Sequence, residues 1–265
     1  MYLGVCGWPV AHSRSPDMHN AALAAVGLDG WRYLLLPLPP ELFAETVRAL
    51  PAAGFRGVNV TIPYKEAAIG LADTASPPAL AIGAANTLTF DGDGAIAAEN
   101  TDWTGLLDVL PDPAGKTAVV LGAGGAARAA VYALLQAGAA DVAVWNRTPE
   151  RARGLAEALG ARIVEHPDPA QIVVNCTSVG LTEPETPFTA LPLRADDWDA
   201  GSCVVDMVYR EPETQLLEAA RTRGARAIGG LEILVAQGAA SFERWTGRTA
   251  PRQAMREAVG AIAST

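Results

Sequence analysis

Lysine is scarce in this sequence. Lys65 and Lys116 are the only two lysines among 20 basic residues, and all the others are arginines. A guanidinium stays protonated at any working pH, whereas a partly buried lysine ammonium can shift its pKa and give or take a proton. A site that needs a proton donor could therefore use Lys65 but not an arginine in its place. The alternative is a lysine at a helix start that points into water.

Cysteine is also scarce, and its spacing excludes two kinds of structural support. Cys6, Cys176 and Cys203 are far apart in the chain, and none lies in a CxxC or Cys/His ligand pattern. We therefore expect neither a disulfide framework nor a structural zinc site. His12 and His19 lack partners at metal-ligand spacing, so we expect both to be structural and expect no bound metal.

Long hydrophobic runs are missing as well. None approaches the roughly 18 residues that cross a bilayer, and the start, MYLGVCGWPVAHS, lacks the basic flank and apolar core of a signal peptide. We expect a cytoplasmic protein without a membrane partner. The formal net charge of −9 argues against a nucleic-acid partner, whose phosphates require clustered lysine and arginine. An anionic ligand must then be met by a local basic site.

The order of apolar runs predicts an α/β fold. At 265 residues, two domains of ordinary size are favoured over one. From residue 117 the β-branched runs TAVVLGAGG, DVAVWNRT, IVVNCTS and SCVVDMVY alternate with helical stretches, which is typical of a parallel sheet covered on both faces. Residues 1–90 alternate too, with strands expected at YLGVCG, RYLLLPL, GVNVTI and NTLTF. DVLPDPAGK is the expected connection, and the chain is expected to be helical after residue 230.

A glycine-rich turn follows the strand at residue 117. LGAGGAARAA contains Gly122-x-Gly124-x-x-Ala127, the form of the dinucleotide fingerprint that ends in alanine. The first glycine permits a tight turn, and the second lets a pyrophosphate approach the N–H groups at the helix N-terminus. We expect Gly122, Ala123, Gly124, Gly125 and Ala126 to contact the cofactor; the alternative is a purely structural turn.

The end of the next strand predicts which dinucleotide binds. An NAD site usually has Asp or Glu there to hold the ribose hydroxyls, but this chain has Asn146, Arg147 and Thr148. Arg147 and Arg151 lie one helical turn apart and could converge on a 2′-phosphate. We therefore expect NADP, unless both arginines are merely solvated residues at a helix start.

Polar residues gather at strand ends in the amino-terminal half. Ser13 and Ser15, with Asn59 and Thr61 on one strand, offer neutral hydrogen-bonding groups suited to a polyol or a carboxylate, although either serine could be a helix cap. Further along, Asn86 and Asp102 both stand where a strand gives way to a loop. An Asp there is often a cap or turn residue. If Asp102 met Lys65, its carboxylate would hold the ammonium as a general acid/base requires.

Taken together, these motifs resemble the shikimate dehydrogenase family over nearly the full chain. The resemblance rests on GWPVAHSRSPDMHN, NVTIPYK, GAANT, NTDWTG, GAGGAARA, NRTPER, NCTSVGL, DMVYREPETQLL and GGLEILVAQGAASFERWTG, in that order. It implies the reversible reduction of 3-dehydroshikimate to shikimate with NADPH, a step of aromatic amino acid biosynthesis. It also implies a substrate domain, 1–102 with 238–265 packing back on it, and a Rossmann-type domain, 103–237.

The resemblance assigns roles to individual residues. It implies that Lys65 and Asp102 are the catalytic pair, that Met207 and Gly230 lie near the nicotinamide, and that the adenosine phosphate meets Asn146, Arg147, Thr148 and Arg151. The residues implied at the shikimate site are Ser13, Ser15, Asn59, Thr61, Lys65, Asn86, Asp102, Tyr209 and Gln237.

Two positions depart from the family pattern, and two other functions stay open. Ala98 replaces a frequent glycine, and Glu232 stands where a small residue is common, close to the implied nicotinamide end. An NAD-dependent quinate/shikimate dehydrogenase is disfavoured because residues 146–148 contain no acidic side chain. A non-catalytic shikimate or dinucleotide sensor is disfavoured because it would need no proton donor. The sequence allows either a monomer or a homodimer.

Overall fold

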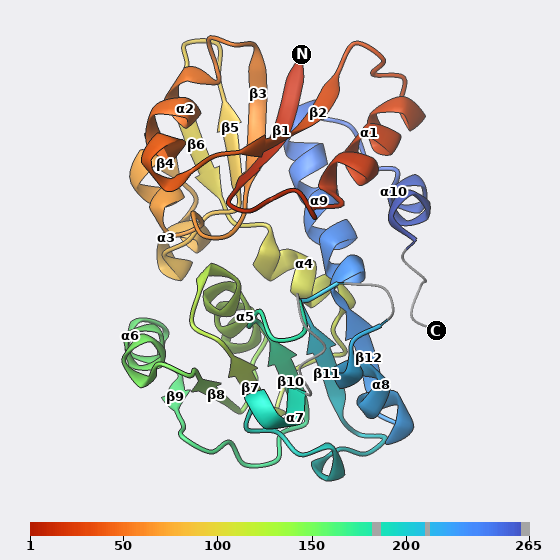
Figure 1. Ribbon diagram of the computed structural model, residues 1–265. Coiled ribbons are helices and arrows are strands. Elements are labelled where there is room, and N and C mark those ends of the chain that lie inside the picture. The colour runs from red at the N-terminus through yellow and green to blue at the C-terminus, as the bar shows by residue number, and fades with distance from the viewer. Residues whose placement is uncertain (182–186, 210–212, 261–265) are drawn as a thin grey trace. The chain divides into compact units, whose positions relative to one another are not determined.

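The computed structural model describes residues 1–181, 187–209 and 213–260 (Figure 1). The chain forms two compact α/β units, and the predicted fold class is confirmed. One unit contains Met1–Gly105 and a segment that begins at Leu234, and the other contains Leu106–Ile233. The sequence boundaries after residues 102 and 237 fall inside helices α4 (Asp102–Val109) and α9 (Gly230–Thr246), so each helix contributes residues to both units.

The first unit is built on a mixed six-stranded sheet with the order β2-β1-β3-β5-β6-β4. β1 is parallel to β2 and β3, β5 is antiparallel to β3 and β6, and β4 is parallel to β6. The strands are β1 (Tyr2–Gly7), β2 (Arg32–Pro37), β3 (Phe55–Val60), β4 (Thr74–Ala75), β5 (Thr87–Phe90) and β6 (Ile96–Glu99). The sequence predicted all of these except β4 and β6.

Helices cover both faces of this first sheet. Phe43 and Val47 of α2 pack with Cys6 and Val58 on one face, and α1 lies on the other (Figure 1). The helices before α4 are α1 (Ser15–Ala25), η1 (Pro40–Leu42), α2 (Phe43–Ala49), η2 (Ala67–Leu71) and α3 (Pro77–Ile82). The helix that follows Lys65 is a short 3₁₀ helix, η2.

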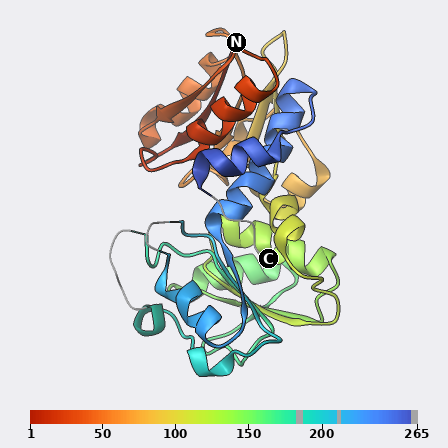
Figure 2. The same ribbon diagram turned by 90° about the vertical axis from the view of Figure 1, so that its right-hand side faces the viewer.

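The C-terminal segment is helical, as expected, and returns to the first unit. Helix α10 (Arg252–Val259) lies beside α1 and buries Met255 and Val259 (Figure 2). Helix α9 approaches α1 closely at Gly238, where a Cβ atom would lie 2.2 Å from Cε of Met18. Within the described residues, no helix combines the length and apolar character that a bilayer span requires.

The second unit is built on a parallel sheet with the order β12-β11-β10-β7-β8-β9. Its elements are β7 (Thr117–Leu121), α5 (Gly125–Gln136), β8 (Asp141–Trp145), α6 (Pro149–Leu159), β9 (Arg162–Ile163), β10 (Ile172–Asn175), α7 (Pro187–Ala190), η3 (Ala195–Asp197), β11 (Cys203–Asp206), α8 (Gln215–Thr222) and β12 (Arg226–Gly229). Helices α7 and α8 pack on one face, and α5 and α6 cover the other (Figure 1). The order reverses between β7 and β10, which is where such sheets bind ligands at their carboxyl edge.

Candidate active site

Lys65 and Asp102 meet in the first unit. Lys65 lies in the loop between β3 and η2, and Asp102 is the first residue of α4. The Lys65 Nζ atom is 2.8 Å from Asp102 Oδ2, and the two side chains are 15% and 10% exposed. A carboxylate at a helix N-terminus is stabilised by the helix dipole, and Asn100 Oδ1 accepts a hydrogen bond from the Asp102 backbone N–H at 3.0 Å. Asp102 is therefore fixed through its backbone N–H as well as through the ion pair.

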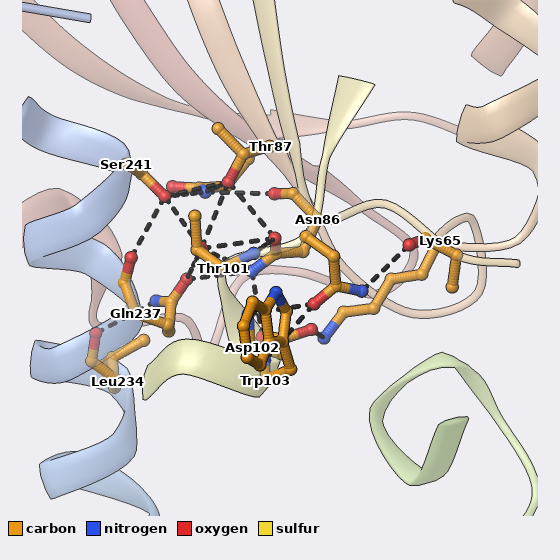
Figure 3. A network of polar contacts seen from close by, with 12 residues as sticks. Lys65, Asn86, Thr87, Thr101, Asp102, Trp103, Leu234, Gln237 and Ser241 are labelled. Atoms are coloured by element: carbon orange, nitrogen blue, oxygen red, sulfur yellow. Dashed lines mark hydrogen bonds and ion pairs between the residues drawn. The ribbon is translucent and has the colours of Figure 1, made fainter. Parts of the chain in front are cut away.

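Asn86 holds the second carboxylate oxygen of Asp102 (Figure 3). The backbone N–H of Thr101 donates to Asn86 Oδ1 at 2.7 Å, so the amide nitrogen must face the other way. From there Nδ2 donates to Asp102 Oδ1 at 2.9 Å and to Gln237 Oε1 at 3.1 Å. Gln237 Nε2 in turn donates to the carbonyl of Leu234, which fixes its orientation. Two of the predicted amides, Asn86 and Gln237, thus belong to the Asp102 network.

A second layer of buried groups lies behind this network. Asn59, another predicted site residue, is 5% exposed and donates to the Asn86 carbonyl oxygen and to Ser241 Oγ, both at 3.0 Å. Its Oδ1 accepts from the Tyr33 hydroxyl at 2.7 Å. Thr87 Oγ1 and Ser241 Oγ are 2.9 Å apart. Asn59 therefore bonds to protein groups at both ends of its amide and supports Asn86 from behind.

Sequence reasoning missed four members of the network: Thr87, Thr101, Asn100 and Ser241. Thr87 and Thr101 adjoin the predicted Asn86 and Asp102. Ser241 follows Gln237 by one helical turn of α9, and its hydroxyl donates to the Gln237 carbonyl. The spacing of four residues was a usable signal, because it places both side chains on one helix face.

The serine pair lies at the start of α1. Ser13 Oγ is 3.2 Å from Ser15 Oγ and accepts from the Ser15 backbone N–H at 3.3 Å. Thr61 lies next to the end of β1, where a Cβ on Gly7 would be 2.5 Å from Thr61 Cγ2. Ser15 is buried, while Ser13 and Thr61 are half-buried. No hydrogen bond joins these three residues to the Lys65–Asp102 pair in the described part of the chain.

The glycine turn of the second unit has the shape that a pyrophosphate needs. Gly122 has φ +113°, and a Cβ there would lie 3.1 Å from backbone atoms of Cys176. Gly124 precedes α5 as its N-cap, and no atom lies within 4 Å of the place where its Cβ would be. Ala123 is buried, and Gly125 and Ala126 are half-buried in the first turn of α5. The backbone at Gly124 is therefore open to a close approach.

The residues that follow β8 include two arginines without an ion-pair partner among the described residues. Asn146 Nδ2 donates to the Thr148 carbonyl at 3.0 Å, and Thr148 is the N-cap of α6. Arg147 and Arg151 are exposed, and within the described ranges neither forms an ion pair. These arginines are therefore free to pair with an anion, and the glycine turn and the arginines together fit NADP.

The remaining predicted residues, Met207, Tyr209 and Gly230, also belong to the second unit. Met207 and Tyr209 are half-buried after β11. Gly230 packs against the Met207 peptide, because a Cβ there would lie 2.5 Å from the Met207 carbonyl oxygen. The described residues contain no group of three or more His, Cys, Asp or Glu side chains arranged for a metal ion.

This fold and these residues define a dinucleotide-dependent oxidoreductase. Residues 5–88 match the family model described as the shikimate dehydrogenase substrate binding domain, 107–178 match shikimate / quinate 5-dehydrogenase, and 230–259 match the shikimate 5'-dehydrogenase C-terminal domain. A shikimate dehydrogenase (NADP(+)) of Moorella thermoacetica is 45% identical over 98% of this chain and 94% of its own length. The chain belongs to the shikimate dehydrogenase family, and the predicted resemblance is confirmed.

Solved structures agree with this family membership. Shikimate 5-dehydrogenase of Thermus thermophilus, in complex with NADP(H) and shikimate, has a TM-score of 0.88 and 41% identity, covering 99% of this chain and 100% of that one. Shikimate dehydrogenase of Aquifex aeolicus has a TM-score of 0.89 and 38% identity, with 98% and 97% coverage. The two-unit fold is thus shared over essentially the full length.

Proposed function

We propose that this chain catalyses the reversible NADP-dependent reduction of 3-dehydroshikimate to shikimate, a step of aromatic amino acid biosynthesis. The observation that carries the proposal is the Lys65–Asp102 ion pair with Asn86 on the second carboxylate oxygen. Family membership supports it, since the relatives compared are named NADP(+) shikimate dehydrogenases. Lys65 and Asp102 are also the two residues that the sequence resemblance implies as the catalytic pair.

The chemistry follows from what each side chain can do with a proton. NADPH held at the glycine turn and the two arginines would supply a hydride to the ketone carbon of the substrate. The alkoxide that develops must be protonated, and Lys65 Nζ is the donor. One of its three hydrogens points at Asp102 Oδ2, which leaves two for the substrate oxygen. General acid catalysis of this kind contributes roughly 10²–10⁴ in rate.

Asp102 has two tasks in this proposal. Its carboxylate anchors the Lys65 ammonium, and it can accept a hydrogen bond from a substrate hydroxyl. Asn86 and the Asn100 cap hold it in place, so that the pair is oriented before substrate arrives. In the reverse direction Lys65, once deprotonated, accepts the proton of the shikimate hydroxyl.

The residue assignments form the second part of the proposal. The first unit binds shikimate, through the neutral hydroxyls of Ser13, Ser15 and Thr61 and the Asp102 network. The second unit binds NADP, with the pyrophosphate on the glycine turn and the 2′-phosphate between Arg147 and Arg151. The protein acts in the cytoplasm as a monomer or a homodimer, and Lys65 and Asp102 come from one chain in either case.

One spectrophotometric experiment separates this function from the alternatives. Shikimate and quinate are each oxidised with NADP and with NAD, in four combinations. We expect shikimate with NADP to give the highest kcat/KM. Quinate with NADP should be poorer because a pocket that merely lacks a partner for the extra hydroxyl discriminates by about 1–3 kcal/mol. Faster turnover of quinate with NAD would favour the quinate/shikimate dehydrogenase, and no turnover in any combination would favour a sensor.

A further inference from the structure

A buried carboxylate that the proposed mechanism does not use lies at the carboxyl edge of the second sheet. Asp206 ends β11 and is 1% exposed. It lies opposite Asn175, the last residue of β10, which is also 1% exposed. Burial raises the pKa of Asp206, and hydrogen bonds from Thr214, the Val208 N–H and Asn175 oppose that shift. A buried charge is costly unless hydrogen bonds compensate it. The groups that donate hydrogen bonds to Asp206 are therefore the groups whose positions it fixes.

Asp206 and Asn175 connect two loops that follow neighbouring strands. Asp206 Oδ1 accepts from Asn175 Nδ2 at 2.9 Å and from the Val208 N–H at 3.1 Å, and Oδ2 accepts from Thr214 Oγ1 at 2.7 Å. Asn175 Oδ1 accepts from the N–H and the hydroxyl of Thr177, at 3.0 and 2.7 Å. The pair thus fixes the Cys176–Thr177 turn and the Met207–Val208 turn together.

Both turns also contact glycines on either side. The Cys176 backbone packs against Gly122 of the glycine turn, and the Met207 carbonyl packs against Gly230. In addition, the Met207 N–H donates to the Asn175 carbonyl at 3.0 Å. The ends of β7, β10, β11 and β12 therefore form one row of contacts with the Asn175–Asp206 pair at its centre.

The strand order shows which half of a dinucleotide lies over this row. Arg147 and Arg151 follow β8, on one side of β7, and the Asn175–Asp206 pair ends β10 and β11, on the other. A dinucleotide with its pyrophosphate at the β7 turn and its adenosine phosphate at the arginines must extend its second half toward β10. We infer that Asn175 and Asp206 are positioning residues for the nicotinamide half of the cofactor site. This inference rests on the proposed function.

The test compares Asp206→Leu with Asp206→Asn in the full-length protein. Leucine leaves three buried donors without an acceptor, and we expect kcat for shikimate oxidation to fall by at least about tenfold. Asparagine keeps an acceptor for Asn175 and Val208, and its NH₂ group can donate to Thr214 Oγ1. The kcat of Asp206→Asn should therefore stay within about threefold of the wild-type value. Adenosine 2′,5′-bisphosphate, which lacks the nicotinamide half, should bind both variants within about twofold of wild type because its site is separate.

Ser202→Ala is the matched control at the amino end of β11. Its buried hydroxyl forms hydrogen bonds with Asp199, so its loss should lower the melting temperature and leave kcat unchanged.

The inference is overturned if Asp206→Leu keeps kcat within about threefold of wild type, or if bisphosphate affinity falls in parallel with kcat. If Asp206→Leu does not fold, Thr214→Val replaces it: an unchanged kcat overturns the inference, and a loss of about threefold with unchanged bisphosphate affinity supports it. A wild-type protein that binds the bisphosphate but oxidises no shikimate would instead contradict the proposed function.

Discussion

Lys65 and Asp102 are 37 positions apart in the chain and meet as an ion pair whose Nζ and Oδ2 atoms are 2.8 Å apart. The opposite oxygen of Asp102 is held by Asn86, whose amide orientation is fixed by the Thr101 N–H. The proposed proton donor, Lys65, thus has a counter-ion whose orientation is fixed by Asn86. Each contact in this arrangement can be changed separately.

Asn86 is the first contact to change. Asn86→Asp places a second carboxylate beside Asp102, whereas Asn86→Ala only removes a donor. At pH 8 we expect kcat/KM of Asn86→Ala to be about 10–100-fold below that of wild type. We expect kcat/KM of Asn86→Asp to be lower still, because its two carboxylates repel each other. An Asn86→Asp enzyme as fast as Asn86→Ala at pH 8 would show that Asn86 does not contact the ionised Asp102 during turnover.

Gly105 allows α4 to approach α9. A Cβ at Gly105 would lie 2.7 Å from the Gln237 backbone nitrogen and 2.9 Å from its Cα, so Gly105→Ala must part the helices. We expect a loss of about 1–3 kcal/mol in the free energy of unfolding and a lower kcat through displaced Gln237. The control is Gly154→Ala on exposed α6, where nothing lies within 4 Å of the new Cβ and a gain of about 0.5–1 kcal/mol is expected. Urea unfolding measures both; similar effects of the two substitutions would contradict the close approach.

The proposed function assigns the cofactor preference to Arg147 and Arg151. Replacing both by glutamine should raise KM for NADP by at least about tenfold, because charge-assisted hydrogen bonds to the 2′-phosphate are lost. KM for NAD should hardly change. Arg153→Gln, on the same helix, controls for the loss of surface charge. Equal weakening of both cofactors would mean that the arginines hold the pyrophosphate or the fold.

His19 makes stability depend on pH. It is fully buried against Tyr33, Phe242 and Trp245, and neither ring nitrogen has a hydrogen-bond partner among the described residues. Burial lowers its pKa from 6.5 to about 3. Between these values the unfolded chain binds the proton and the folded chain does not. Stability from this group is therefore complete above about pH 6.5 and falls with acidification, by up to about 1.4 kcal/mol per pH unit.

His19→Phe removes the titrating imidazole and serves as the comparison protein. Urea unfolding from pH 7 to 4 should give a steeper loss of stability for wild type than for His19→Phe, whatever their difference at pH 7. Parallel curves would mean that His19 is protonated in the folded protein or accessible to water.

The four central strands of the second sheet, β11, β10, β7 and β8, were predictable from sequence, whereas its edge strands β9 and β12 were not. The first sheet was also predicted only in part. The β10 and β11 runs are β-branched and apolar throughout, as strands buried on both faces must be. In contrast, β6 reads IAAE, and β4 has only two residues, so neither gives a strand signal. Their place in the sheet depends on pairing with β5 and with each other, which is a tertiary effect.

The candidate site shows a similar limit. The chemistry of Lys65 and Asp102 could be predicted from residue type, but their meeting depends on how α4 is set against the loop after β3. Ser241 and Thr87 are ordinary residues in helix and strand, and their importance follows from buried bonds to Asn59 and to each other. No local pattern reports a hydrogen bond between residues 154 positions apart.

The turnover of Lys65→Arg tests the central claim most directly. Arginine keeps the positive charge and can pair with Asp102, but it cannot release a proton. We predict that kcat for shikimate oxidation with NADP falls by at least about a hundredfold while the shikimate Kd changes by less than about fivefold. Lys116→Arg, which changes the other lysine of the chain, should leave kcat unchanged. A Lys65→Arg enzyme with kcat within about threefold of wild type would contradict proton donation by Lys65.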